Sequence, residues 1–182
     1  MKYSLYFLVL FVITACGSSE LKSDFNCSNA SYSNLSKTED VRNLFSVQLP
    51  KNWKVNLYYD NGQTSIYAAD TTLNLTKTTL FDASYIHAPV FFDATFKQKI
   101  NADNTQMGLE EVKSKDIKHL DKTSFYSLAK GKKGKYTYHI LNVFTKVNSD
   151  NFLHVKTEIY GDSLVNERIC KAINLLDKIE VK

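Results

Sequence analysis

Arginine is scarce in this chain of 182 residues. Arg42 and Arg168 are its only arginines, so the excess of basic over acidic residues, 23 against 19, comes from lysine. Proteins that read nucleic acids rely on arginine for paired hydrogen bonds to bases and phosphates. The composition therefore argues against a nucleic-acid partner, and we expect the lysines to keep the surface solvated.

The motifs that mark common catalytic and metal sites are also missing. The sequence has no Gly-x-Ser-x-Gly and no glycine-rich phosphate loop. Its histidines show no His-x-His or His-x-x-x-His spacing, which metal sites commonly use. We therefore expect no catalytic residue set, no metal and no cofactor. The histidines are His87, His119, His139 and His154.

Long apolar runs are absent except at the N-terminus. Lys2 precedes an apolar stretch from Tyr3 to Ile13. The stretch is shorter than the roughly 20 residues that a transmembrane helix needs, and its length is typical of a signal peptide. No later run is long enough to span a bilayer, so we expect the rest of the chain to be water-soluble.

The stretch that follows, Ile13-Thr14-Ala15-Cys16, resembles a bacterial lipobox. In such signals the cysteine thiol receives a diacylglycerol, the preceding peptide is removed, and the new amino group is acylated. Two or more acyl chains give a stable membrane anchor. The resemblance implies a signal peptide at 1–15 and a lipidated Cys16; the alternative is an ordinary signal with a chance cysteine. Gly17 is not the aspartate that retains some lipoproteins at the inner membrane, which favours the outer membrane and a periplasm-facing domain.

Residues 16–40 are rich in Ser, Asn and Lys and are predicted to be a flexible tether, which leaves 41–182 as a single domain. If Cys16 carries lipid, Cys27 and Cys170 remain. An even number of cysteines in an oxidising compartment favours a disulfide between them, and two free thiols are the alternative.

Alternation of apolar and polar residues predicts strands through most of the domain. Asn61-Gly62 predicts a tight hairpin between two of them. Residues 71–89 show no clean pattern and are read as an irregular loop that ends in a short strand. The expected strands are 45–49, 53–59, 64–70, 83–87, 109–113, 117–120, 124–130, 136–146 and 152–160, with a short one at 179–181.

Two helices are expected. Phe92, Phe96 and Ile100 recur at a spacing of four and predict a helix over 90–101, with Pro89 suited to its first turn. This stripe is read as core packing rather than a ligand groove. A second apolar stripe from Val165 to Leu176 predicts a C-terminal helix. Asp162 or Ser163 would cap its start.

The order of these elements predicts an α+β fold, a twisted antiparallel sheet packed against two main helices. Pairing Val143 with Val155 gives the last hairpin a sensible core face. In that register His139 and His154 lie on opposite faces and cannot share a metal. One face of the hairpin then carries a set of aromatic residues, which is either covered by a helix or exposed for binding. The set includes Tyr138, Phe144, Phe152 and Tyr160.

The stretch FSVQLPKNW resembles the opening of PsbP-like and DcrB-like domains, in which an aromatic and apolar strand ends in Leu-Pro and is followed by Trp. These positions are Phe45, Val47, Leu49, Pro50 and Trp53. The C-terminal helix is similar too. The resemblance covers about 40–182 and implies a PsbP-like sheet between helices, with an accessory or binding role. The metal-binding and photosystem-contacting residues of plant members do not map onto this sequence.

The leading hypothesis is a non-catalytic binding or accessory lipoprotein of the cell envelope, with an envelope protein as a possible partner. The alternative is a small hydrolase whose residues are dispersed in the fold, with His87, Asp82 and Asp93 as candidates. A structural envelope role is a third option. The lysine-rich 130–135 is read as a solvated turn, against an alternative contact with lipid headgroups.

Overall fold

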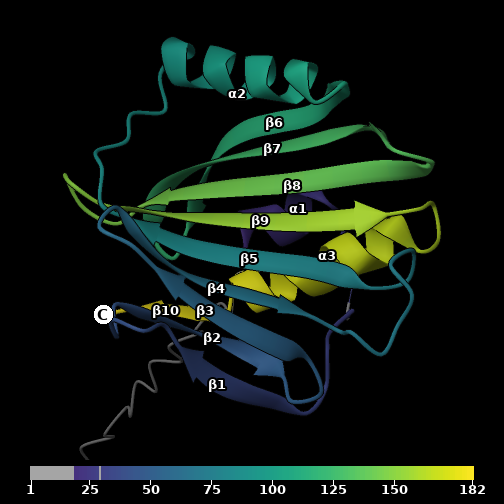
Figure 1. Cartoon of the computed structure of the whole chain (residues 1–182). Coiled ribbons are helices and arrows are strands. Elements are labelled where there is room, and N and C mark those ends of the chain that lie inside the picture. Colours follow the sequence, from purple (N-terminus) through teal and green to yellow (C-terminus); the bar gives the residue numbers. More distant parts are fainter. Residues whose placement is uncertain (1–18, 29) are drawn as a thin grey trace, which may run out of the picture.

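The computed structural model describes residues 19–28 and 30–182. A seven-stranded antiparallel sheet in the order β3-β4-β5-β9-β8-β7-β6 forms its centre, and a three-stranded sheet in the order β1-β2-β10 lies beside it (Figure 1). The elements are α1 (Glu20–Asp24), β1 (Leu35–Glu39), β2 (Phe45–Pro50), β3 (Lys54–Tyr59), β4 (Gln63–Ala69), β5 (Thr79–Ile86), α2 (Ala94–Gln106), β6 (Leu109–His119), β7 (Lys122–Lys133), β8 (Tyr136–Lys146), β9 (Phe152–Tyr160), α3 (Val165–Leu176) and β10 (Ile179–Val181). The predicted α+β class is confirmed.

The two main helices cover opposite faces of the large sheet. Along β7, Phe125 packs with the aromatic residues of α2, whereas the next residue, Tyr126, belongs to the core beneath α3. Successive side chains of a strand point to opposite faces, so α2 and α3 lie on opposite sides. This is the arrangement that the sequence predicts.

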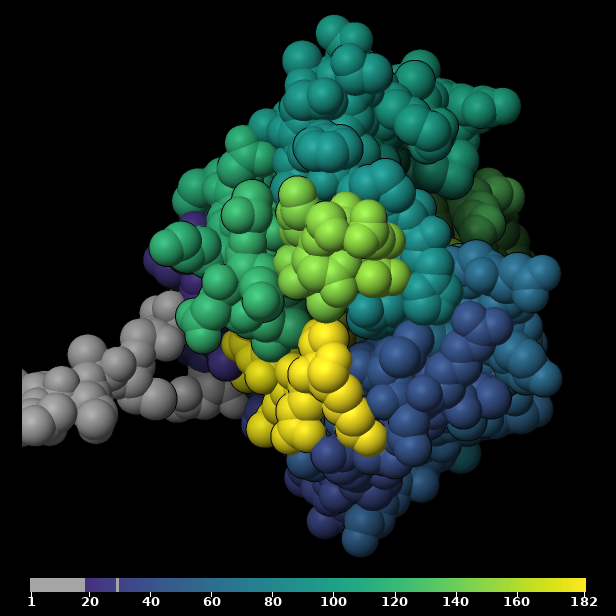
Figure 2. Space-filling view, turned by 90° about the vertical axis from the view of Figure 1, so that its left-hand side faces the viewer, coloured from purple at the N-terminus to yellow at the C-terminus, as the bar shows by residue number. Residues whose placement is uncertain are grey.

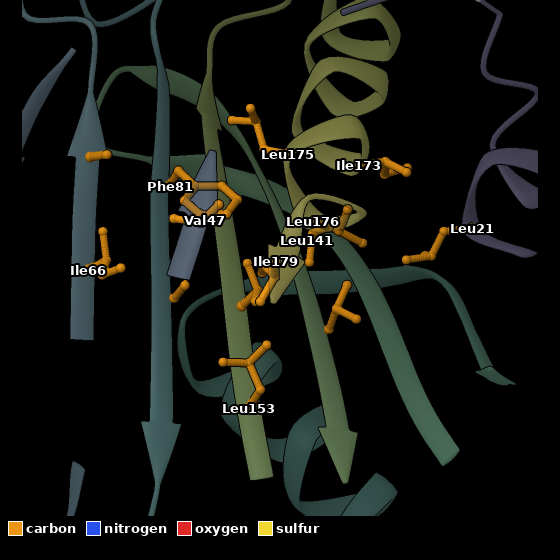
Figure 3. Close-up of a cluster of buried hydrophobic side chains, with 14 of the residues drawn as sticks. Leu21, Val47, Ile66, Phe81, Leu141, Leu153, Ile173, Leu175, Leu176 and Ile179 are labelled. Atoms are coloured by element: carbon orange, nitrogen blue, oxygen red, sulfur yellow. The ribbon is translucent and has the colours of Figure 1, made fainter. Parts of the chain in front are cut away.

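The main core lies between the large sheet, α3 and the small sheet. Phe81 and Leu141 from the large sheet meet Leu175 and Leu176 from α3, and Val47 approaches from β2 (Figure 3). All of them are almost completely buried. Burying one such side chain contributes roughly 1.5–3 kcal/mol, so this shared interior joins the two sheets and α3 into one unit.

The hairpins follow the predicted registers. Tyr59 pairs with Thr64 across the Asn61-Gly62 turn. Val143 pairs with Val155 between β8 and β9. The prediction that His139 and His154 occupy opposite faces is therefore confirmed, because His139 lies opposite Ile159 and His154 opposite Phe144.

The segment expected to be a flexible tether is folded wherever it is described, so that prediction is wrong from Ser19 onward. Leu21 on α1 is fully buried. The Asp24 carboxylate accepts a hydrogen bond from the Tyr126 hydroxyl and pairs with Lys115 at 3.0 Å. The strand β1 extends the small sheet by pairing with β2. These contacts are long-range, and the local composition carries no signal of them.

A disulfide joins Cys27 to Cys170, with 5.3 Å between their Cα atoms, as predicted. It connects the loop after α1 to the middle of α3. The signal peptide at 1–15 and the lipidated Cys16 lie outside the described residues.

Several element boundaries differ from prediction. β5 begins at Thr79 rather than Ala83, so the last third of the supposed loop is strand. β6 is one strand with a bulge between Glu111 and Lys113, rather than two short strands. α3 has no side-chain cap and begins after Leu164, whose backbone is left-handed at φ 51°, so neither Asp162 nor Ser163 caps it.

Candidate functional site

Helix α2 stands on the outer face of the large sheet, held at both ends. The carboxylate of Asp93 caps it by accepting a hydrogen bond from the Phe96 backbone N–H at 2.9 Å. The helix therefore begins at Ala94, later than predicted, and Pro89 lies outside it. Lys97 forms a 2.6 Å ion pair with Asp116 on β6. At the other end, the buried Asn104 donates to Ser127 Oγ at 3.4 Å.

The aromatic stripe of α2 packs against the sheet. The ring of Phe96 meets Phe144 edge-to-face at 5.1 Å and Phe125 at 6.0 Å, and Phe92 contacts it edge-to-face as well. The sequence-based choice of core packing is therefore correct for this stripe. The choice is incomplete, however, because Phe96 and Ile100 also form one wall of a groove.

This groove runs between α2 and the sheet and has a volume of about 540 Å³. That size falls within the roughly 300–1,000 Å³ of small-molecule and cofactor sites, which are apolar with a few convergent polar groups. The lining residues are Phe96, Lys99, Ile100, Asp103, Asn104 and Met107 from α2, with Lys133, Tyr138, Ile140, Asn142, Phe144, Phe152, His154, Lys156 and Glu158 from the sheet. We call it the α2 groove.

A network of charged groups occupies one end of the α2 groove. Glu158 on β9 is only 9% exposed, yet its carboxylate lies 3.3 Å from Lys156 Nζ and 3.4 Å from Lys133 Nζ. The Tyr160 hydroxyl donates to the same carboxylate at 3.3 Å. Lys156 also contacts Asp82 at 3.4 Å. The network therefore holds two lysines and two carboxylates beside an aromatic floor.

The network keeps its members charged. Burial raises the pKa of Glu158, but the Tyr138 hydroxyl and the two ammonium groups outweigh it, so the pKa lies below its ordinary value of 4.5. Burial lowers the pKa of Lys156, but Asp82 and Glu158 outweigh it and raise the value. The Tyr160 hydroxyl and the Glu158 carboxylate likewise raise the pKa of Lys133. Glu158 is therefore a poor proton acceptor at neutral pH.

His154 lies further along the floor, stacked on Phe144 with 4.2 Å between the ring centroids. Its Nε2 is 3.0 Å from Asn142 Oδ1 and therefore carries the proton in this contact. Burial, together with Lys156, lowers the pKa of His154 to about 3. The imidazole is thus neutral in the folded protein at neutral pH.

The aromatic face that the sequence left undecided is buried. Tyr138, Phe144 and Tyr160 are each less than a tenth exposed. Phe144 and Phe152 lie beneath α2, whereas Tyr138 and Tyr160 pack with Leu109 and with each other. Lys133 covers both tyrosine rings from 4.8 and 5.5 Å. The α2 groove is what remains open over this face.

The three residues proposed for a hydrolase do not assemble. His87 contacts Arg42 and Asn151. Asp82 pairs with Lys156, and Asp93 caps α2. No hydrogen bond in the described structure joins any two of the three, although all three residues are described. The hydrogen-bonded cluster that the hydrolase hypothesis required is therefore not formed.

Among residues 19–28 and 30–182, no group of three or more His, Cys, Asp or Glu side chains is arranged to hold a metal ion. None of the described helices has both the length and the apolar character needed to cross a membrane.

The lysine-rich 130–135 segment is mostly strand, which corrects its reading as a turn. β7 continues to Lys133, and the turn itself is Gly134-Lys135, where Gly134 has φ 61°. Gly131 serves close packing instead, because a Cβ there would lie 2.5 Å from the Gly108 carbonyl oxygen.

The charged network of the α2 groove was missed from the sequence, although a signal for it exists. Alternation along β9 places His154, Lys156 and Glu158 on the same face as Phe152 and Tyr160. Charged residues on a face that also carries aromatic rings indicate either a network or a site. The predicted register already contained this information.

No family model matches the chain, and no curated protein matches it. Solved structures do. The cyanobacterial PsbP (CyanoP) of Synechocystis matches with a TM-score of 0.60 and 10% identity, over 86% of this chain and 97% of that one. The Ran-binding protein Mog1p of Saccharomyces cerevisiae matches with a TM-score of 0.54 and 11% identity, over 81% and 95%.

A structure from Bacteroides thetaiotaomicron matches with a TM-score of 0.52 and 14% identity, over 82% of this chain and 49% of that one. The chain therefore has the fold shared by PsbP and Mog1. The PsbP-like fold implied by the FSVQLPKNW stretch is confirmed, and identities this low show the fold alone.

Proposed function

We propose that this protein is a lipid-anchored lipoprotein of the cell envelope that binds a partner protein through the α2 groove and is not an enzyme. The anchoring half of the proposal rests on Ile13-Thr14-Ala15-Cys16, with a basic residue and an apolar run before it. The Cys27–Cys170 disulfide supports it, because disulfides persist mainly in oxidising compartments outside the cytosol.

The single observation that carries the binding half is the composition of the α2 groove. Its wall and floor are aromatic and aliphatic, and one end presents the fixed charges of Lys133, Lys156 and Glu158. Apolar surface supplies affinity in such a site, and a few placed charges supply orientation. Mog1p, which shares the fold, is a Ran-binding protein, and this likeness supports a protein partner.

The chemistry of the groove favours recognition over catalysis. A general base needs a pKa near the working pH and a free lone pair toward the substrate. Glu158 instead has a lowered pKa and is occupied by two lysines and a tyrosine. His154 keeps a lone pair on Nδ1, but its pKa of about 3 makes it a weak base at neutral pH. Neither group is poised to transfer a proton.

The anchoring half is tested by the intact mass of protein extracted from membranes of cells that express the whole chain. We expect a chain that begins at Cys16 and carries the mass of a diacylglycerol and an acyl group. A Cys16→Ala variant with a cleavable ordinary signal is the control, and it should leave the membrane fraction. A wild-type protein without the lipid mass overturns the anchoring half and leaves the groove untouched.

A further inference from the structure

The folded part of the chain begins very close to the proposed anchor. Cys16 and Ser19 are three residues apart, and three residues span at most roughly 11 Å when fully extended. Ser19 is already part of the fold, since its hydroxyl donates to Asp177 Oδ2 at 3.1 Å. A lipid on Cys16 therefore leaves no room for a long tether, and Ser19 must lie next to the headgroups.

Ser19 marks one end of the molecule. Its partner Asp177 follows the last turn of α3, and Lys22 pairs with the same carboxylate at 2.7 Å. The β6–β7 turn lies at this end too, because Lys122 and Leu120 share a hollow with Ile179 and Lys182 of the C-terminal strand. Figure 2 looks onto this end, with the yellow C-terminal residues below the green β6–β7 region.

This end carries lysines that are free to meet an anionic surface. Lys118, Lys122 and Lys178 are exposed, and among the described residues none of them has an ion-pair partner within 4.0 Å. The exposed carboxylates at this end are Asp121 in the same turn, Asp150 in the β8–β9 turn and Glu20 beside Ser19. The three lysines are the groups that can pair with anionic lipid headgroups. We call Lys118, Lys122 and Lys178 the anchored-end lysines.

We propose that the anchored-end lysines rest on the headgroups of a bilayer that contains anionic lipids, with the sheet standing away from it. This inference rests on the proposed lipidation of Cys16. β7 runs from Lys122 at this end to Lys133 at the other, a span of roughly 36 Å at about 3.3 Å per residue. The charged end of the α2 groove, with Lys133 and Glu158, then faces the aqueous space.

The proposed orientation also places the lysine-rich 130–135 segment relative to the membrane. In this arrangement Lys130, Lys132 and Lys135 stand at the far end of β7 and β8, away from the membrane that holds the anchor. They do not touch its headgroups. The headgroup contact belongs to the anchored-end lysines instead.

The test uses the lipidated full chain, purified in detergent and reconstituted into vesicles with anionic lipid and a headgroup-attached quencher. Two variants, Lys122→Cys and Lys132→Cys, each add one free thiol for a fluorophore, because Cys27 and Cys170 are bonded to each other. We expect the label at 122 to lose most of its emission and the label at 132 to keep it. Equal quenching at both positions, or stronger quenching at 132, overturns the orientation.

The intact mass of each reconstituted sample distinguishes a failure of the lipid anchor at Cys16 from a failure of the proposed orientation. A chain without lipid at Cys16 overturns the anchoring half of the proposed function, and the orientation falls with it. A lipidated chain with the wrong quenching pattern overturns the orientation alone.

A second measurement isolates the charges. The Cys16→Ala chain is sedimented with anionic vesicles after Lys118→Gln, Lys122→Gln and Lys178→Gln together, or after the matched set Lys130→Gln, Lys132→Gln and Lys135→Gln. Each lysine near an anionic surface contributes about 1 kcal/mol, so the first set should weaken partitioning roughly a hundredfold. The second set should leave it nearly unchanged, and the reverse ranking contradicts the proposal.

Discussion

The ammonium group of Lys156 lies 3.3 Å from the carboxylate of Glu158 on the floor of a groove that is otherwise largely aromatic and aliphatic. Taking these charges out of water is unfavourable, and only their mutual attraction and the surrounding hydroxyl groups offset that. Such a network fixes the positions of its members. A fixed pattern of charge beside an apolar surface is suited to orienting a bound partner.

Glu158→Gln should destabilise the protein. It removes the carboxylate that neutralises two lysines, one of them only partly buried, and breaking a buried ion pair costs about 3–5 kcal/mol. Because Lys133 is 57% exposed and can turn toward water, we expect the lower end of that range, about 3 kcal/mol. Urea denaturation measures the free energy of unfolding.

Asp103→Asn is the matched control for that variant. Asp103 lines the same groove but pairs with Lys99 at the surface of α2. Exposed ion pairs contribute about 0–1 kcal/mol, so the loss should stay below about 1 kcal/mol. Equal losses for the two variants would show that the Glu158 network adds nothing to an ordinary surface pair.

Acid should destabilise the protein in part through His154. Its folded-state pKa of about 3 lies below the ordinary value of 6.5, so the unfolded chain binds the extra proton first. The stability contribution is complete above pH 6.5 and is lost as the pH falls from there toward 3. The buried His119 and His139 also have lowered pKa values and add to the same slope.

His154→Gln should therefore flatten the fall of unfolding free energy across this pH window. The wild type, measured in the same series, is the reference. The measurement is a series of urea denaturations at successive pH values. A wild-type slope in the His154→Gln variant would contradict the burial of this imidazole.

Loss of the disulfide should weaken the fold without changing it. The bond closes a loop with a sequence separation of 143 residues, and removing a native disulfide from a small domain typically costs about 2–5 kcal/mol. We expect a Cys27→Ser and Cys170→Ser double variant to unfold at a lower urea concentration than the wild type. Adding a reductant should lower the urea midpoint of the wild type and leave that of the double variant unchanged. A wild type indifferent to reductant, with two reactive thiols, contradicts the bond.

The parts of the fold that follow local patterns could be predicted from the sequence. Asn61-Gly62 fixed one hairpin, and alternation through β8 and β9 gave their bounds and register. The helix stripes at Phe96 and Ile169 likewise gave α2 and α3. In these elements burial and periodicity agree, so a short stretch contains the information.

The parts of the fold that could not be predicted depend on contacts with residues far away in the sequence. Leu21 and the strand β1 look like linker because their local composition is polar, and only contacts with β2, β6 and α3 order them. The α2 groove was missed for a similar reason. The spacing of Phe96 and Ile100 indicates burial, but it does not reveal that the helix stands off the sheet near Lys133 and Glu158.

Site-directed photo-crosslinking in native membranes tests the central claim most directly. One crosslinker replaces Met107, which lines the α2 groove and is 50% exposed. The other replaces Leu73, which is 47% exposed on the loop between β4 and β5. We predict one dominant protein partner, captured from position 107 and not from 73, and more weakly when Cys16→Ala removes the anchor. Equal capture from both positions, or none from 107, would contradict the α2 groove as the binding site.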